Sequence, residues 1–190
     1  MATDVNKVFL GFLGHIVTED REYLGGLLVT TLEGVPKEFK HTEPVRPSRL
    51  QTVIYGESLE PCLGSDAIAE TLYSQMAVKP TAICVDETGQ PLFGRFVANN
   101  PPGALLLRFS STEHAFGQFL APDGNLLEGV ELQSRAPSGG HLYAYVEDDS
   151  TGAGRRTLEL ASQRMNLESA FDRVRQVLHE IAQIDKTPSR

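Results

Sequence analysis

The sequence predicts one protein of the α+β or α/β class, built on a mixed or antiparallel central sheet that carries helices. Three observations support this class. Short apolar segments recur along the chain between turn residues, as expected of strands. Two helical patterns, at residues 48–60 and 65–77, follow the second strand of a hairpin. A longer apolar stripe at helical spacing fills residues 167–184, and such a stripe must pack on a sheet or on a partner.

The first strands lie in the N-terminal part of the chain. Residues 5–17 are apolar enough for an interior strand, and residues 27–31 continue with a run typical of a strand buried on both faces. Glu33-Gly34 is a turn signal, because glycine adopts positive φ without a Cβ clash. The returning segment 35–41 is polar and contains a proline, which predicts an edge strand.

Two helices are expected after this hairpin. Pro44 and Pro47 keep the preceding chain extended, and Ser48 is a candidate N-cap for the first helix. A second cap at Ser65-Asp66 is expected to begin the next helix. The two helices are predicted to bury apolar side chains at helical spacing, namely Leu50, Val53 and Ile54 in the first and Ile68, Leu72 and Met76 in the second.

The run EPVRPSRLQTVIYGESLEP, residues 43–61, resembles a segment of uncharacterised bacterial proteins of similar size. The preceding hairpin sequence LLVTTLEG fits the same family. The resemblance covers about a fifth of the chain, and the family implies no activity, cofactor or catalytic residue. A role in a bacterial defence system is one hypothesis for such a protein.

The middle of the chain predicts a second hairpin and then a boundary. Residues 81–85 form an apolar strand, and residues 92–97 are expected to return antiparallel to it. Asn99 to Gly103, NNPPG, is the strongest break in the chain. It divides an N-terminal lobe, 1–98, from a C-terminal lobe, 104–190, and the two are expected to form one compact domain.

The C-terminal half predicts an antiparallel meander followed by a helix. The meander strands are expected at 104–109, 115–120, 126–133 and 141–147. The polar, glycine-rich segment 148–156 is expected to be a loop. Asn166 is a candidate N-cap for the helix 167–184, which should bury Phe171, Val174 and Leu178.

Composition narrows the range of partners and locations. The 25 acidic and 17 basic residues give a formal charge of −8, which opposes long-range attraction to nucleic acid and to anionic membranes. Nucleic-acid and membrane partners are therefore not expected. The N-terminus lacks the features of a signal peptide, so the chain is expected to be cytoplasmic. Cys62 and Cys84 are not expected to form a disulfide.

Motifs for common chemistries are missing from the sequence. The five histidines have no ligand spacing and no Cys-x-x-Cys is present, so neither a metal site nor a cofactor is expected. The glycine-rich segment 151–156 lacks the Gly-Lys-Ser/Thr ending of a phosphate-binding loop and is interpreted as a connector. No nucleophile with a general base stands out.

The favoured interpretation is a non-enzymatic protein-interaction or regulatory subunit, an adaptor in a bacterial cytoplasmic complex. Its partner would be a protein, bound by a polar group that two prolines and a capped helix hold in place. The candidate binding residues are Arg46, Arg49, Tyr55 and Glu57.

The alternative is a small enzyme or ligand-binding domain whose site is assembled from residues distant in sequence. Ligands of α/β proteins commonly bind where strands lead into helices or loops. The polar residues nearest the expected junctions are His41, Glu43, Tyr55 and Asp86.

Overall fold

The protein contains one seven-stranded sheet with the strand order β3-β2-β1-β4-β5-β7-β6. The computed structural model describes residues 8–86, 88–89, 92–93, 96, 105–110, 129–133, 141–146 and 153–184, with the backbone alone for 105–110, 129–133, 141–146 and 153–155. The strands are β1 Phe9–Val17, β2 Tyr23–Thr31, β3 Pro36–His41, β4 Ala82–Asp86, β5 Leu105–Ser110, β6 Gly129–Gln133 and β7 His141–Val146.

The sheet is mixed, which confirms the predicted class. Strand β1 pairs antiparallel with β2 and parallel with β4, and β4 pairs parallel with β5. The outer strands β7 and β6 are antiparallel to their neighbours. Since β1, β4 and β5 run in the same direction, their carboxyl ends lie at one edge of the sheet.

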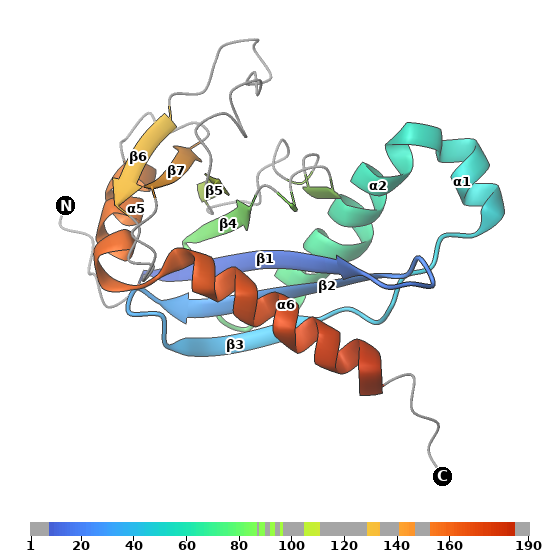
Figure 1. Ribbon diagram of the computed structural model, residues 1–190, viewed down its shortest axis with the longest axis horizontal. Helices are drawn as coiled ribbons and strands as arrows, with labels where there is room; N and C mark the ends of the chain where they lie inside the picture. The colour runs from blue at the N-terminus through green and yellow to red at the C-terminus, as the bar shows by residue number, and fades with distance from the viewer. Residues whose placement is uncertain are drawn as a thin grey trace.

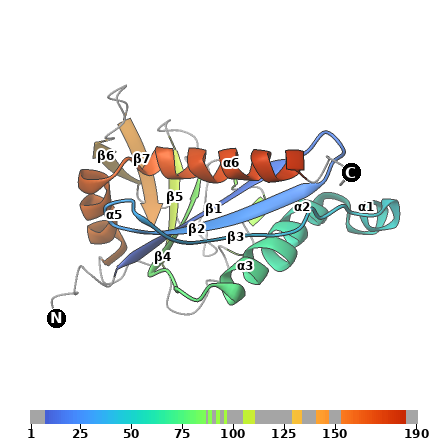
Figure 2. The same ribbon diagram turned by 90° about the horizontal axis from the view of Figure 1, so that it is seen from below.

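Helices cover both faces of the sheet (Figures 1 and 2). Helix α6, Leu167–Ile184, crosses one face, and α5, Ala153–Arg164, contributes to the same hydrophobic cluster. The opposite face is covered by the segment that ends in α3, Glu70–Gln75. The sheet therefore forms the middle of three layers, with a separate apolar cluster on each face.

The C-terminal helix has the predicted bounds and the predicted buried face. The Asn166 side chain accepts hydrogen bonds from the backbone amides of Glu168 and Ser169 at 3.1 and 3.3 Å, so the predicted N-cap is confirmed. Phe171, Val174 and Leu178 are buried, and the Phe171 ring meets the Phe12 ring of β1 edge-on at 5.3 Å. Burial of this stripe holds α6 to the sheet.

Two further expectations for the N-terminal half are confirmed. Ser48 caps α1, Arg49–Tyr55, in a capping box with Gln51. The turn before β3 carries Gly34 at a φ of 79°, and β3 lies at an edge of the sheet.

The helical region after β3 differs from the prediction, because it is one interrupted helical run and not two capped helices. It proceeds through α1, a 3₁₀ turn η2 (Gly56–Ser58), α2 (Leu59–Cys62), a π-helical segment η3 (Leu63–Ala69) and α3. The predicted cap at Ser65-Asp66 is wrong. Ser65 is fully buried inside η3, where its hydroxyl accepts a hydrogen bond from the Phe96 amide at 2.6 Å.

The predicted burial of the α1 apolar residues is also wrong. Leu50, Val53 and Ile54 are 69%, 74% and 69% exposed. Helix α1 projects beyond the layers of the molecule, so the sheet does not reach it (Figure 1). The amphipathic pattern predicted a helix correctly, but periodicity alone cannot show whether a packing surface lies opposite.

Two predictions after α3 are wrong as well. The segment 92–97 was expected to return as a strand, but Leu92, Phe93 and Phe96 are helical and buried. Strand β4 instead has the parallel neighbours β1 and β5, a pairing between segments distant in sequence. The expected loop 148–156 runs into α5, which begins at Ala153 and buries Leu158 and Ala161.

Some expectations concern residues outside the described ranges, namely the break at 99–103 and the strand at 115–120. Among the described residues, no helix is long and apolar enough to span a membrane.

Candidate functional site

Polar side chains gather where β1 and β4 end. The two strands are paired in parallel up to Leu13 and Val85, so His15 of β1 and Asp86 of β4 both follow this pair at the carboxyl edge. Side chains alternate along a strand. Asp86 therefore shares the face of Cys84, which packs toward α6, whereas His15 shares the face of Leu13, which packs toward α3.

Asp86 is 8% exposed and is the last residue of β4. Its carboxylate accepts a hydrogen bond from the Thr88 hydroxyl at 2.7 Å and one from the Gly89 amide at 2.9 Å. It also forms an ion pair with Arg175 of α6. These three donors compensate for the burial of the charge, because a buried carboxylate without partners would be strongly disfavoured.

Arg175 joins two carboxylates. One terminal nitrogen of its guanidinium contacts Asp86, and the other lies 3.1 Å from the carboxylate of Asp172, three residues earlier on the same helix. The Arg175 side chain is 31% exposed. The group thus connects the end of β4 to α6 and still reaches solvent.

His15 is half-buried, and its ring meets the Phe93 ring edge-on at 5.6 Å. Its Nδ1 atom is buried and has no hydrogen-bond partner among the described residues. Burial lowers the pKa of His15 below its usual value; the Asp86 carboxylate opposes this shift, and the Arg175 charge adds to it. At neutral pH the imidazole is therefore mainly uncharged.

A second polar contact lies on the α2 side. The Tyr23 hydroxyl of β2 donates a 2.8 Å hydrogen bond to the Glu60 carboxylate of α2. Partial burial, together with this acidic partner, raises the pKa of Tyr23 to about 12. Glu60 also contributes to the electrostatic environment of His15, so the contact belongs to the same edge of the sheet.

The described residues do not form a metal site. Catalytic metal ions are often held between carboxylates. In the described part of the chain, no three histidine, cysteine, aspartate or glutamate side chains come close enough to bind one ion. The carboxylates of Asp86 and Asp172 instead share the guanidinium of Arg175.

A basic hollow of about 470 Å³, here called the arginine pocket, lies beyond the end of β1. It forms between the turn after β1 and the start of α1. Its lining residues are Asp20, Arg21, Arg46, Pro47, Arg49, Thr52 and Val53.

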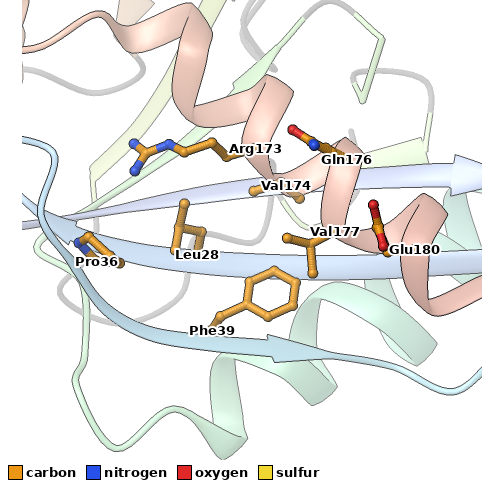
Figure 3. A pocket seen from close by; sticks show the side chains of 8 residues that line it. All are labelled: Leu28, Pro36, Phe39, Arg173, Val174, Gln176, Val177 and Glu180. Atoms are coloured by element: carbon orange, nitrogen blue, oxygen red, sulfur yellow. The ribbon is translucent and has the colours of Figure 1, made fainter.

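A second hollow, of about 490 Å³, lies between α6 and the strands β2 and β3 (Figure 3). Leu28, Phe39 and Val177 point into it and make it mainly apolar, while the charges of Arg173 and Glu180 stand at α6. Its polar lining residues Arg173, Gln176 and Glu180 all belong to α6.

The structure brings together only part of the predicted partner-binding set. Arg46 and Arg49 line one pocket, with Arg21 added from the β1–β2 turn. Tyr55, at the end of α1, and Glu57, in η2, are exposed and do not line it.

The alternative ligand set is spread over the molecule. His41 ends the edge strand β3, and Glu43 follows it in an exposed loop. Asp86 belongs to β4, three strand spacings from β3, which corresponds to roughly 14 Å across a sheet. Of this set, Asp86 alone lies at the polar cluster of the carboxyl edge, with partners other than those expected.

His15, Arg175 and Arg21 were not among the predicted site residues. His15 is the one titratable side chain of β1, Phe9–Val17, and a histidine in so apolar a segment was a usable signal. Arg175 lies 89 residues from Asp86, and the sequence gives no indication of their pairing.

Comparisons with known proteins give no sequence match: neither a family model nor a curated protein matches. Some solved structures are similar in fold. Ciona intestinalis endonuclease V in its D234N form, bound to a 23mer DNA containing an inosine followed by a ribo-adenosine, is similar with a TM-score of 0.53, 11% identity and coverage of 91% of this chain and 86% of that one. Human endonuclease V gives a TM-score of 0.51 with 15% identity, over 95% and 86% of the two chains.

This chain shares the fold of endonuclease V. The likeness corrects the interpretation as a non-enzymatic adaptor with a protein partner and no nucleic acid, since the similar structures are nucleases and one of them holds DNA. The alternative hypothesis, a site built from residues distant in sequence, agrees better with the polar cluster at the carboxyl edge.

Proposed function

We propose that the protein binds nucleic acid at the carboxyl edge of β1 and β4, where His15, Asp86 and Arg175 gather. The observation that carries this proposal is the fold, which is similar to endonuclease V over more than nine tenths of this chain. A nuclease of this fold was solved on DNA. The edge that we propose for binding is also where the buried charges and the shifted histidine lie.

The formal charge of −8 does not exclude this function, because binding depends on the local distribution of charge. The arginine pocket lies at the same end of the sheet as His15, next to the turn that follows β1. Basic groups at that end provide local attraction for phosphates, although the whole molecule is acidic.

We place this function in the cytoplasm. Cys62 and Cys84 form no disulfide with each other, as is usual in a reducing compartment.

Binding can be measured by fluorescence anisotropy with labelled 23-nucleotide probes, as single strands and as duplexes, with and without inosine. We expect saturable binding that weakens as salt rises, because displaced counterions drive the association. A matched pair of variants tests the location. Val17→Glu adds a negative charge at the end of β1, where Val17 is 49% exposed, and should weaken binding. Val35→Glu adds the same charge at the opposite end, where Val35 is 53% exposed, and should not.

Absence of saturable binding to every probe would refute the proposed function. Equal weakening by Val17→Glu and Val35→Glu would show that net charge, and not the carboxyl edge, controls the association. The same mixtures run on a denaturing gel report strand cleavage, which would extend the proposal from binding to hydrolysis.

A further inference from the structure

The arginine pocket contains two guanidinium groups that have no counter-ion in the part of the chain that the structure describes. Arg21 and Arg49 are both exposed, and neither forms an ion pair or hydrogen bond through its side chain with another described residue. Exposed arginines of this kind are suited to bind phosphate, because the planar guanidinium offers a fork of donors that matches phosphate oxygens.

The third arginine has a structural role. Arg46 lies 3.9 Å from the Asp20 carboxylate and 3.8 Å from the Glu22 carboxylate, and it donates a 3.0 Å hydrogen bond to the Asp20 carbonyl. These contacts fix the β1–β2 turn against the segment before α1. Asp20, which also lines the pocket, and Glu22 both pair with Arg46, and neither is paired with Arg21 or Arg49.

The backbone holds Arg21 in an unfavourable conformation. Its φ of 58° is the one positive value at a non-glycine residue in the described chain. The turn is closed by hydrogen bonds between Thr18 and Arg21 at 3.0 Å and between Thr18 and Glu22 at 2.9 Å. Left-handed geometry costs a non-glycine residue roughly 1–2 kcal/mol. A glycine would therefore be more stable at position 21, unless the arginine side chain has a function.

The helix beside the pocket presents apolar groups to solvent. Val53, which lines the pocket, is 74% exposed, and Tyr55 on the same helix is 46% exposed. A single nucleic-acid strand offers both phosphates and the apolar faces of unpaired bases, which a positively charged hollow beside apolar or aromatic side chains can bind.

We propose that the arginine pocket and the adjacent α1 surface bind a single-stranded nucleic acid, with Arg21 and Arg49 contacting consecutive backbone phosphates. This inference rests on the proposed function and names the surface and the strand class. A hollow of about 470 Å³ falls in the size range of small-molecule pockets and accommodates a nucleotide of a flexible strand. In duplex DNA the bases are paired and stacked inside the helix, so their faces are not offered to such a hollow.

The test compares Arg21→Gln/Arg49→Gln with wild-type protein, using single-stranded and duplex probes of one sequence. For a single strand, each phosphate contact contributes about 0.7 to the slope of log affinity against log salt, so the double variant should lower its magnitude by about 1.4. We expect affinity for the single strand to fall at least tenfold and affinity for the duplex to change little. The control Lys37→Gln/Arg164→Gln removes the same charge at the far end of the sheet and should leave both affinities and the slope unchanged.

Arg21→Gly separates binding from folding. It relieves the left-handed strain, so the melting temperature should not fall. Affinity for the single strand should still drop, because the guanidinium is lost. Weak binding combined with a lower melting temperature would instead assign Arg21 a purely structural role.

The outcomes distinguish the two proposals. If wild-type protein binds the single strand and Arg21→Gln/Arg49→Gln binds it equally well, the pocket inference fails while the proposed function stands. If no probe binds at all, the proposed function fails. If Leu50→Asp and Ile54→Asp convert a dimer to a monomer by light scattering without changing single-strand affinity, the α1 surface is a protein interface and the inference is overturned.

Discussion

His15 shows how one residue can depend on charges from three elements. Its ring belongs to β1, whereas the charges that act on it come from β4, α6 and α2. Burial is the largest influence and keeps the imidazole neutral. Because Asp86 and Arg175 have opposite effects on the pKa of His15, a substitution of either residue should shift this pKa in a defined direction.

We therefore expect Asp86→Asn to lower the pKa of His15 further, because it removes the negative charge that favours the protonated ring. Arg175→Gln should raise this pKa, because it removes a repelling positive charge. Titration of the His15 ring followed by NMR measures both shifts. His179, which lies on α6 outside this cluster, serves as the internal reference. Unchanged His15 titration in both variants would show that the three groups do not interact.

The same shift sets a pH dependence of stability. The pKa of His15 in the folded protein is below 6.5, its ordinary value, so the unfolded chain takes up a proton first as pH falls. Stability should consequently decrease as pH drops below about 6.5. In His15→Gln this decrease should be reduced. Denaturant unfolding at several pH values measures it, and identical pH profiles would contradict the assignment.

The π-helical segment η3 connects the α3 layer to the residues after β4 by close packing and a hydrogen bond. Gly64 approaches the Leu92 carbonyl so closely that a Cβ atom at residue 64 would lie 2.0 Å from its oxygen. The hydroxyl of the adjacent Ser65 accepts a hydrogen bond from the Phe96 amide. Single π-helical turns often occur at functional positions, and here the wider turn brings two small residues against a neighbouring segment.

We expect Ser65→Ala to reduce the free energy of unfolding by about 1–3 kcal/mol, because it leaves the buried Phe96 amide without an acceptor. Chemical denaturation measures the change. The control is Ser58→Ala, since the exposed Ser58 hydroxyl donates a hydrogen bond to the Tyr55 carbonyl within its own turn. That variant should be nearly neutral, and an equal loss in both would argue against a special role for the buried bond.

At the scale of the whole molecule, a single sheet separates two apolar layers. Fully buried residues such as Leu10 and Phe12 face α6, while Leu27 and Ile83 face the α3 layer. The carboxyl edge of the parallel strands is where both layers end, and there the polar cluster and the arginine pocket face solvent. The candidate site thus depends on the integrity of both layers.

Phe171 tests how strongly α6 contributes to this architecture. Phe171→Ala removes a 3% exposed ring that packs edge-on against Phe12, and we expect a loss of about 3–5 kcal/mol in the free energy of unfolding. Thermal or denaturant unfolding measures it. Ile184→Ala, at a residue that is 69% exposed on the same helix, should change stability by less than about 0.5 kcal/mol.

The sequence by itself determined the elements whose signals are local. The N-cap at Asn166, the turn at Gly34 and the buried stripe of α6 each follow from residues within one or two turns of each other. The class of a sheet that carries helices also followed, because runs of apolar residues and helical spacing are properties of short segments, whereas the choice between a mixed and an antiparallel sheet did not. Local signals failed where a packing surface was required, as with the exposed α1.

The tertiary structure alone decided the site. The pairing of β1 with β4 brings residues about 70 positions apart into register, and the contact of Asp86 with Arg175 spans 89 positions. Such contacts depend on which segments pack against one another. The packing is determined by the burial of apolar side chains in both layers together. The stability of a helix or a turn depends mainly on residues close together in sequence. A contact between two charges that are distant in sequence depends on the whole fold.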